Sequence, residues 1–288
     1  MPLSEKQGVG SSILPLATKI MKLTSNKLYK LSEKYGTDKS SHGYVHYYDE
    51  LFGNKKNKEI NLLELGIFKG ASIKMWDKYF KKGNIYCIDH LGTENPLTNN
   101  TIFSEEVINN LKKESHKIYP YLCEQNDSVK LNEIFQDINF DFIIDDASHF
   151  QKESIQSLGI LFQKLNHNGV YVIEDMCTLW DFQTGSNWGQ KHKLSEEDID
   201  FENLPSKELF SDTLHYCFEK FNEEKIFFSE YLSNFENNYL SENIKSIDII
   251  YAPRSKKQNI ENGNHTIRNE GSKNSKLSAG SLAVITKK

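Results

Sequence analysis

Hydrophobic and polar positions in the middle of the chain follow two alternating patterns. Short runs that are apolar almost throughout, such as "INLLEL" at 60–65, are each followed by apolar residues three or four positions apart, such as Ile73, Trp76 and Phe80. The apolar runs predict buried strands, and the wider spacing predicts amphipathic helices. The other predicted strands are 84–89, 118–125, 140–145 and 169–175, and the other predicted helices lie around 107–111, 131–135 and 155–165. This alternation predicts βαβ units in a parallel sheet with helices on both faces.

The pattern changes at both ends of this alternation. Residues 1–12 are predicted to form a loose tail, and apolar residues at helical spacing then predict two short helices, at 13–23 and 28–35. After Asp175 the chain becomes aromatic and aperiodic, so residues 176–205 are predicted to form a lid loop over a site at the end of the sheet.

The C-terminal part of the chain contains one more helical pattern and two more apolar runs. The helix is predicted around 210–221, and the runs at 246–252 and 281–287 predict two strands that close the sheet. Between them, residues 254–280 are rich in Lys, Asn, Ser and Gly, and we expect a mobile excursion there.

Composition narrows the classes of partner and compartment. The 288 residues include 35 basic and 40 acidic side chains, interspersed, with a formal net charge of -5. This balance argues against a nucleic-acid surface, which needs a basic face. The 4 cysteines show no C-x-x-C pair, and no segment approaches the roughly 20 apolar residues that cross a bilayer. Because the apolar run at 13–17 is too short for a signal peptide, we expect a cytoplasmic protein with reduced thiols.

The first two predicted strands end in residues suited to a nucleoside cofactor, because ligands of open parallel sheets bind beyond the carboxyl ends of the strands. Gly66 and Gly70 allow a tight turn before a helix, and Asp89 can accept hydrogen bonds from a ribose diol. The G-x-x-x-G spacing is weak evidence alone, and a tight turn without a ligand is the alternative. The acidic Glu64 disfavours a pyrophosphate and suits the cationic S-adenosylmethionine, with Ser72 at the start of the next helix.

Carboxylates follow the fourth and fifth predicted strands. In "FDFIIDDASHF" (140–150), Asp146 directly follows the fourth strand, and Glu174 and Asp175 end the next strand. If the two strands are adjacent, the three carboxylates converge, and their mutual repulsion calls for a cation. Oxygen ligands suit Mg²⁺ or Mn²⁺ better than Zn²⁺. The alternative is a set of solvated acids that cap the following helix.

His149 lies three residues after Asp146. A lone histidine is more often a packed or surface residue than a catalyst. Beside a cation that holds a hydroxyl group, however, an imidazole that titrates near neutral pH is a suitable general base.

Three motifs together resemble a known family. They are "KYGTDKSSHGYVHYYDELF" (34–52), "LLELGIFKGAS" (62–72), and "IIDDASH" (143–149) with "VIED" (172–175). In these motifs the chain resembles the class I S-adenosylmethionine-dependent methyltransferases, and within them the metal-dependent sugar O-methyltransferases of the macrolide type. The resemblance implies a doubly wound, mostly parallel, seven-stranded Rossmann-like α/β sheet with helices on both faces and an antiparallel closing hairpin.

The resemblance also implies roles for individual residues. It makes Asp146, Glu174 and Asp175 ligands of Mg²⁺, or of Mn²⁺, with His149 as the catalytic base assisted by Asp146. It places the following residues at S-adenosylmethionine: Thr37, His42, Tyr44, Glu64, Gly66, Gly70, Ser72, Asp89, Gln125 and Asp145. Gln125 is expected near the adenine, and a structural role is the alternative for Asp145.

Domain organisation and function follow from the same resemblance. Residues 1–55 are expected to form a helical extension that covers the cofactor, although composition alone predicts only an exposed helix start in 34–52, and residues 56–288 are expected to form the catalytic domain. The implied activity is methylation of a sugar hydroxyl on a nucleotide sugar or a surface-polysaccharide precursor, by a possible homo-oligomer. A catechol-type or other small-molecule O-methyltransferase is one alternative, and an inactive cofactor-binding or scaffold protein is another. After Asp175 the chain departs from the family pattern, so the acceptor does not carry over.

Overall fold

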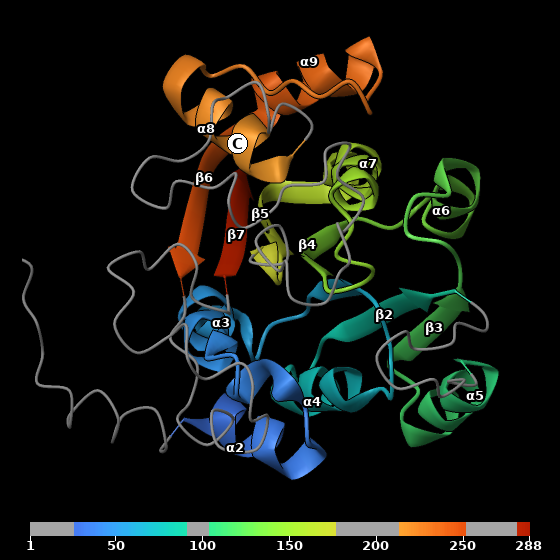
Figure 1. The fold of residues 1–288 in the computed structure, drawn as a ribbon. Coiled ribbons are helices and arrows are strands. Elements are labelled where there is room, and N and C mark those ends of the chain that lie inside the picture. The colour runs from blue at the N-terminus through green and yellow to red at the C-terminus, as the bar shows by residue number, and fades with distance from the viewer. Residues whose placement is uncertain (1–25, 91–103, 177–212, 252–280) are drawn as a thin grey trace, which may run out of the picture.

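A single mixed sheet of seven strands organises the described part of the chain, in the order β3-β2-β1-β4-β5-β7-β6 (Figure 1). The computed structural model describes residues 26–90, 104–176, 213–251 and 281–288. The strands are β1 (Asn61–Leu65), β2 (Asn84–Asp89), β3 (Ile118–Leu122), β4 (Phe140–Asp145), β5 (Leu165–Ile173), β6 (Ile244–Tyr251) and β7 (Ser281–Lys287). The first five run parallel, and β7 pairs antiparallel with both β5 and β6. The predicted fold class is therefore confirmed.

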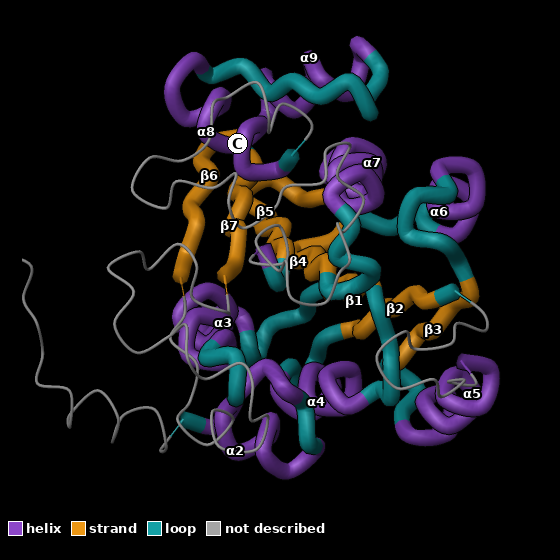
Figure 2. The backbone as a smooth tube through the Cα atoms, in the orientation of Figure 1, coloured by secondary structure: helices purple, strands orange, loops and turns teal. Residues whose placement is uncertain are grey.

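Helices cover both faces of the sheet, as the alternation of patterns predicts (Figure 2). On one face lie α2 (Lys27–Tyr35), α3 (Tyr44–Phe52), α4 (Ala71–Tyr79) and α5 (Ser104–Glu114), and on the other lie α6 (Ser128–Ile134), α7 (Gln151–Leu161), α8 (Leu214–Glu224) and α9 (Asn234–Asn243). Short 3-10 helices are η1 (Asp38–Ser40), η2 (Gly53–Lys55) and η3 (Phe162–Lys164). Each face has its own apolar core, one around Phe52 and Trp76 and the other around Leu158 and Phe218.

Two strand boundaries differ from the prediction by more than two residues. The third strand ends at Leu122 rather than at residue 125, and the fifth begins at Leu165 rather than at residue 169. Polar residues at 166–168 interrupt the apolar run, so the pattern hides the start of β5. Asn168 has a left-handed backbone (φ 56), and the pairing of β4 with β5 shifts register in the same stretch. An irregular strand of this kind breaks the two-residue alternation on which the prediction depends.

Two helices are missing from the prediction or differ from it. Helix α9 has a weak apolar pattern in which only Asn237 and Leu240 are buried, although a capping box of Ser233 and Glu236 marks its start. Helix α3 was expected to be exposed on composition alone. It instead buries Tyr44, Val45, Tyr48 and Phe52 against the sheet and α4, because its aromatic side chains line one face at helical spacing.

Four further predictions fall on other parts of the chain. The tail at 1–12 and the helix at 13–23, most of the lid loop at 176–205, and the excursion at 254–280 lie outside the described residues. Across the described ranges, none of the helices combines the length and the apolar character that a bilayer span requires.

Candidate active site

The carboxyl ends of β1, β4 and β5 bring four acidic residues together. Strand β4 pairs with β1 on one side and with β5 on the other, with Asp145 opposite Leu65 and Ile173. The predicted adjacency of the fourth and fifth strands is therefore confirmed. The acids gathered at this edge are Glu64, Asp146, Glu174 and Asp175.

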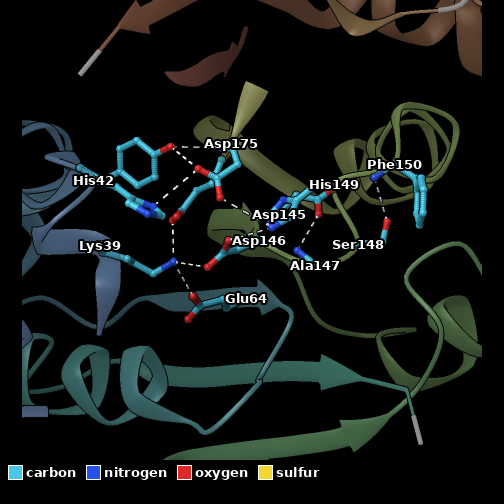
Figure 3. Close-up of polar contacts among 12 residues, drawn as sticks. Lys39, His42, Glu64, Asp145, Asp146, Ala147, Ser148, His149, Phe150 and Asp175 are labelled. Atoms are coloured by element: carbon cyan, nitrogen blue, oxygen red, sulfur yellow. Dashed lines mark hydrogen bonds and ion pairs between the residues drawn. The ribbon is translucent and has the colours of Figure 1, made fainter. Parts of the chain in front are cut away.

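A buried lysine occupies the centre of this acidic group (Figure 3). The Nζ atom of Lys39, from η1, lies 2.5 Å from Asp146 Oδ2 and 2.7 Å from Glu174 Oε1. It also lies 3.1 Å from Glu64 Oε1. The clustered carboxylates predict a cation at this position, but Lys39 was not among the predicted site residues, although it lies inside the segment 34–52. Its place in that segment was the only sign in the sequence that it belongs to the site. Lysines are ordinarily surface residues, and Lys39 lies 107 residues before Asp146.

One ammonium group does not neutralise the buried acids around it. Burial lowers the pKa of Lys39, but the carboxylates of Asp146 and Glu174 outweigh this and raise it well above its ordinary value. Burial, and then the charge of Asp146, raises the pKa of Glu174 well above its ordinary value despite Lys39. Burial also raises the pKa of Glu64. Negative charge is therefore in excess here, and a further cation would be stabilised.

Asp175 is held by the segment that precedes α3 and by α3 itself. The Tyr44 hydroxyl donates to Asp175 Oδ1 at 2.5 Å, and His42 Nδ1 lies 3.6 Å from the same oxygen (Figure 3). Burial acts to raise the pKa of Asp175, but the imidazoles of His42 and His149 bring it below its ordinary value. His42 and Tyr44 were predicted as cofactor contacts, and the structure places their polar atoms on a predicted metal ligand.

His149 faces the same carboxylates from the opposite side. Its Nε2 atom lies 3.9 Å from Asp146 Oδ1 and 3.7 Å from Asp175 Oδ2. The residue has a left-handed backbone conformation (φ 61), which is uncommon outside glycine and often marks functional positions. One ligand atom from each of Asp146, His149 and Asp175 lies within 4.8 Å of the other two, so the trio could hold a metal ion.

A network of buried polar groups holds the turn that carries His149. Gln125 Oε1 accepts a hydrogen bond from the backbone N–H of Ser148 at 3.0 Å. Asp145 Oδ2 accepts from the Ser157 hydroxyl at 2.8 Å, and Gln125 Nε2 lies 3.4 Å from Asp145 Oδ1. Burial raises the pKa of Asp145 to about 6. Gln125 and Asp145 were predicted as cofactor contacts, and in the structure they hold the turn at 146–149 through hydrogen bonds from its backbone N–H groups.

The turn after β1 is built as the glycine spacing suggests. Gly66 (φ 92) lies so close to the end of β4 that a side chain there would collide with the backbone oxygen of Asp146, and Gly70 (φ 75) begins α4. Asp89 Oδ2 accepts from the N–H groups of Ile67 and Phe68 at 2.8 and 3.0 Å. Asp89 thus fixes the loop while its side chain stays 18% exposed.

The two remaining predicted contacts occupy helix starts. Thr37 is the N-cap residue of η1, where its hydroxyl accepts from the N–H of Lys39 at 3.5 Å, and it therefore helps to place Lys39. Ser72 lies in the first turn of α4, beside Glu64, and its hydroxyl acts to lower the pKa of that acid.

Comparisons with known proteins point to one group of enzymes. No family model matches the chain. Demethylmacrocin O-methyltransferase from Streptomyces fradiae is 31% identical over 176 residues, which are 57% of this chain and 40% of that protein. Mycinamicin VI 2''-O-methyltransferase from Micromonospora griseorubida is 30% identical over 163 residues, or 53% of this chain and 37% of that protein. The chain is related to the S-adenosylmethionine-dependent methyltransferases of macrolide sugars.

Solved structures agree with this relationship at the level of the fold. The MycE methyltransferase of the mycinamycin biosynthetic pathway, in complex with Mg, SAH and mycinamycin VI, matches with a TM-score of 0.59 and 21% identity. That match covers 91% of this chain and 53% of MycE. The chain therefore shares the methyltransferase fold, and it spans less than half the length of the two curated relatives that it matches. The family resemblance read from the motifs is confirmed.

Proposed function

We propose that the chain is an S-adenosylmethionine-dependent O-methyltransferase that requires a divalent cation and acts on a sugar hydroxyl of a glycoside. The meeting of Asp146, His149 and Asp175 beside the Gly66 turn carries this proposal. The related enzymes named above support the choice of reaction and acceptor class.

The residues present fit a divalent cation. Mg²⁺ bonds oxygen at about 2.1 Å, so two of its ligands lie at most about 4.2 Å apart. One ligand atom of Asp146 and one of Asp175 lie within 4.8 Å of each other, close to this limit. His149 Nε2 lies 3.9 Å from Asp146 Oδ1 and 3.7 Å from Asp175 Oδ2, beside the proposed ligands, where a base would stand. The excess of buried carboxylates over Lys39 supplies the electrostatic reason for the ion to bind.

The residues also fit a nucleoside cofactor. Asp89 is the last residue of β2, at the edge of the sheet where cofactors of open parallel sheets bind, and its carboxylate is partly exposed. Each carboxylate oxygen can accept more than one hydrogen bond, so Asp89 can hold the loop and also accept from a ribose diol. Glu64 disfavours a phosphate on this side of the turn.

Each residue of the site then has a role. Asp146, Glu174 and Asp175 would hold the cation, and His149 Nε2 would accept the proton of the acceptor hydroxyl. The bound cofactor supplies an activated methyl group, and the bound cation supplies positive charge that orients the hydroxyl and favours loss of its proton. Gln125 and Asp145 keep the 146–149 turn in place, which fixes the direction of the imidazole. Aligning two reactants in this way can account for about 7–11 kcal/mol of a barrier.

The acceptor class rests on the relatives. The two curated relatives are named for O-methylation of demethylmacrocin and of mycinamicin VI, and MycE was solved with mycinamycin VI. We therefore propose a sugar carried by a glycoside. A nucleotide sugar or surface-polysaccharide precursor has no support in these similarities and stays a prediction.

Methyl transfer to a panel of acceptors tests the proposal. The full chain, with S-adenosylmethionine and Mg²⁺, is incubated separately with desmethyl glycosides, nucleotide sugars and catechols, and the products are measured by mass spectrometry. We expect a gain of one methyl group on a glycoside sugar, loss of that product with EDTA, and its return when Mg²⁺ is added in excess. Methylation that is unaffected by EDTA would remove the cation from the proposal. Calorimetry that detects binding of NAD but not of S-adenosylmethionine would reject the whole proposal.

A further inference from the structure

Two tyrosines of α3 hold the carboxylates of two consecutive residues at the end of β5. The Tyr44 hydroxyl donates to Asp175 Oδ1 at 2.5 Å, and the Tyr48 hydroxyl donates to Glu174 Oε1 at 2.5 Å. Both tyrosines are fully buried. Positions 44 and 48 are one helical turn apart, so both side chains leave the same face of α3 toward the sheet.

The two oxygens of the Asp175 carboxylate have different contacts. Oδ1 is bound by the Tyr44 hydroxyl, while Oδ2 lies 3.7 Å from His149 Nε2, on the side where the cation is proposed. A carboxylate whose rotation is blocked in this way presents a fixed oxygen to an ion. Without the hydroxyl, part of the binding energy would be spent on ordering the side chain.

Tyr44 also stabilises the backbone of Asp175. The residue has a left-handed conformation (φ 53), which costs about 1–2 kcal/mol for a residue with a side chain. The Tyr44 oxygen accepts a hydrogen bond from the Asp175 backbone N–H at 3.3 Å, in addition to donating to its side chain. One phenol therefore supports both the direction of the backbone and the rotation of the carboxylate.

We propose that Tyr44 and Tyr48 are positioning residues of the cation site. Tyr44 holds Asp175 by Oδ1, and Tyr48 together with Lys39 holds Glu174 by Oε1, so that both carboxylates are preorganised for the ion. This inference rests on the proposed function, because it assumes that a divalent cation binds there. It assigns to α3 a part in cation binding, in addition to the cofactor contact that was predicted for Tyr44. Because hydrogen-bond partners of metal ligands typically contribute 10–100-fold to metal affinity, the effect is large enough to measure.

Removal of each tyrosine hydroxyl tests the inference by metal binding, with no need for an activity assay. In the full-length chain, Tyr44→Phe and Tyr48→Phe remove only the hydroxyl oxygen and keep the aromatic packing. Mn²⁺ is titrated into each protein, and the unbound ion is measured by electron paramagnetic resonance. We expect about 10–100-fold weaker Mn²⁺ binding in each variant.

Tyr79→Phe is the matched control. Tyr79 is also fully buried, and its hydroxyl donates to the carboxylate of Asp49 at 2.7 Å, outside the site. We expect its Mn²⁺ affinity to stay within about twofold of the wild type, as distant and independent sites do not couple appreciably. Thermal unfolding without metal, measured on all three variants, reports the structural cost of losing a buried hydroxyl.

The outcomes separate this inference from the proposed function. Wild-type protein that binds Mn²⁺, together with Tyr44→Phe and Tyr48→Phe variants that bind it equally well, overturns the inference and leaves the proposed function standing. An equal loss of affinity in Tyr79→Phe also overturns the inference, because the effect is then general destabilisation. Wild-type protein that binds no Mn²⁺ overturns the cation site and the inference together.

Discussion

Two clusters of acids and lysines, one around the buried Asp77 and one around the buried Lys39, differ in their balance of charge. Around Asp77, in α4, one carboxylate meets Lys78 Nζ at 2.8 Å, Lys117 Nζ at 3.0 Å and the Ser115 hydroxyl at 2.9 Å. At the ends of β1, β4 and β5, one lysine meets three carboxylates. With Glu114 Oε1 3.9 Å from Lys78, the first cluster has as many carboxylates as lysines, whereas in the second the carboxylates outnumber the lysine.

The pKa values follow this difference. Burial acts to raise the pKa of Asp77, but hydrogen bonds from its lysine and serine neighbours hold it below its ordinary value. Burial and the charge of Asp146 raise the pKa of Glu174 well above its ordinary value. The cluster at Asp77 is complete by itself and joins α4 to the start of β3. In the cluster at Lys39 the carboxylates outnumber the lysine, and such an excess of negative charge favours the binding of a cation.

Replacement of His149 should have the largest effect of these changes, and it should act only at the site that contains the Lys39 cluster. We expect His149→Ala to lower turnover by about 10²–10⁴-fold, because a general base typically contributes that much. Affinity for S-adenosylmethionine, measured by calorimetry, should stay within a few-fold. A variant that keeps most of its turnover would remove the base assignment.

Removal of the lysine from each cluster should separate the two by stability. Lys39→Met leaves the buried carboxylates of Glu64 and Glu174 and the partly buried one of Asp146 without their shared cation, so we expect the free energy of unfolding to fall by about 3–5 kcal/mol. The matched variant is Lys117→Met, which leaves Asp77 with Lys78 and Ser115, and it should cost less. Denaturant unfolding measures both, and an equal cost would contradict the difference between the clusters.

The stability that Asp77 contributes should depend on pH. A lowered folded-state pKa means that Asp77 contributes stability above its unfolded-state pKa, and that this contribution disappears as pH falls through the folded-state pKa. We expect Asp77→Asn to lower the free energy of unfolding by about 1–3 kcal/mol at pH 6, where hydrogen bonds to a charged group are lost. The cost should shrink as the pH falls below the ordinary pKa of 3.8. Urea unfolding of the wild type and of Asp77→Asn across this pH range measures the cost. A cost that grows toward acid pH would contradict the prediction.

Removal of one acid from the Lys39 cluster should have the smallest effect. Glu64→Gln takes away a buried carboxylate whose pKa is raised by burial and, to a smaller extent, by the charge of Asp146, so relief of the cost of burying this charge offsets the lost ion pair with Lys39. We expect the free energy of unfolding to change by less than about 1 kcal/mol. Asp77→Asn is the matched acid-to-amide change in the other cluster. If Glu64→Gln destabilises the protein by more, the excess of negative charge does not govern the stability of this site.

Much of the fold could be predicted from the sequence because buried parallel strands and amphipathic helices have distinct periods. The pattern placed the five parallel strands and the closing pair close to their observed positions, with errors at the end of β3 and the start of β5. Helix α9 was missed because only Asn237 and Leu240 of it are buried, which leaves no apolar stripe to read.

The candidate site could be predicted in part. Asp146, Glu174 and Asp175 come from the ends of adjacent strands, and the adjacency was confirmed. Lys39 was missed because no local pattern distinguishes a lysine that will be buried from one that stays in solvent. The same limit applies to Gln125 and Asp145, whose shared network with Ser157 is visible only when α7 packs on the sheet.

The sequence alone determined the order of strands and helices, the family resemblance and the residue types at the strand ends, because each of these is carried by short-range spacing. The tertiary structure decided which atoms meet. Lys39 and Glu174 are 135 residues apart, and Tyr44 and Asp175 are 131 residues apart. Their contacts exist because apolar residues pack α3 against the sheet, and this packing carries the polar side chains of the same segment to the ends of β4 and β5. No spacing along the chain records that position.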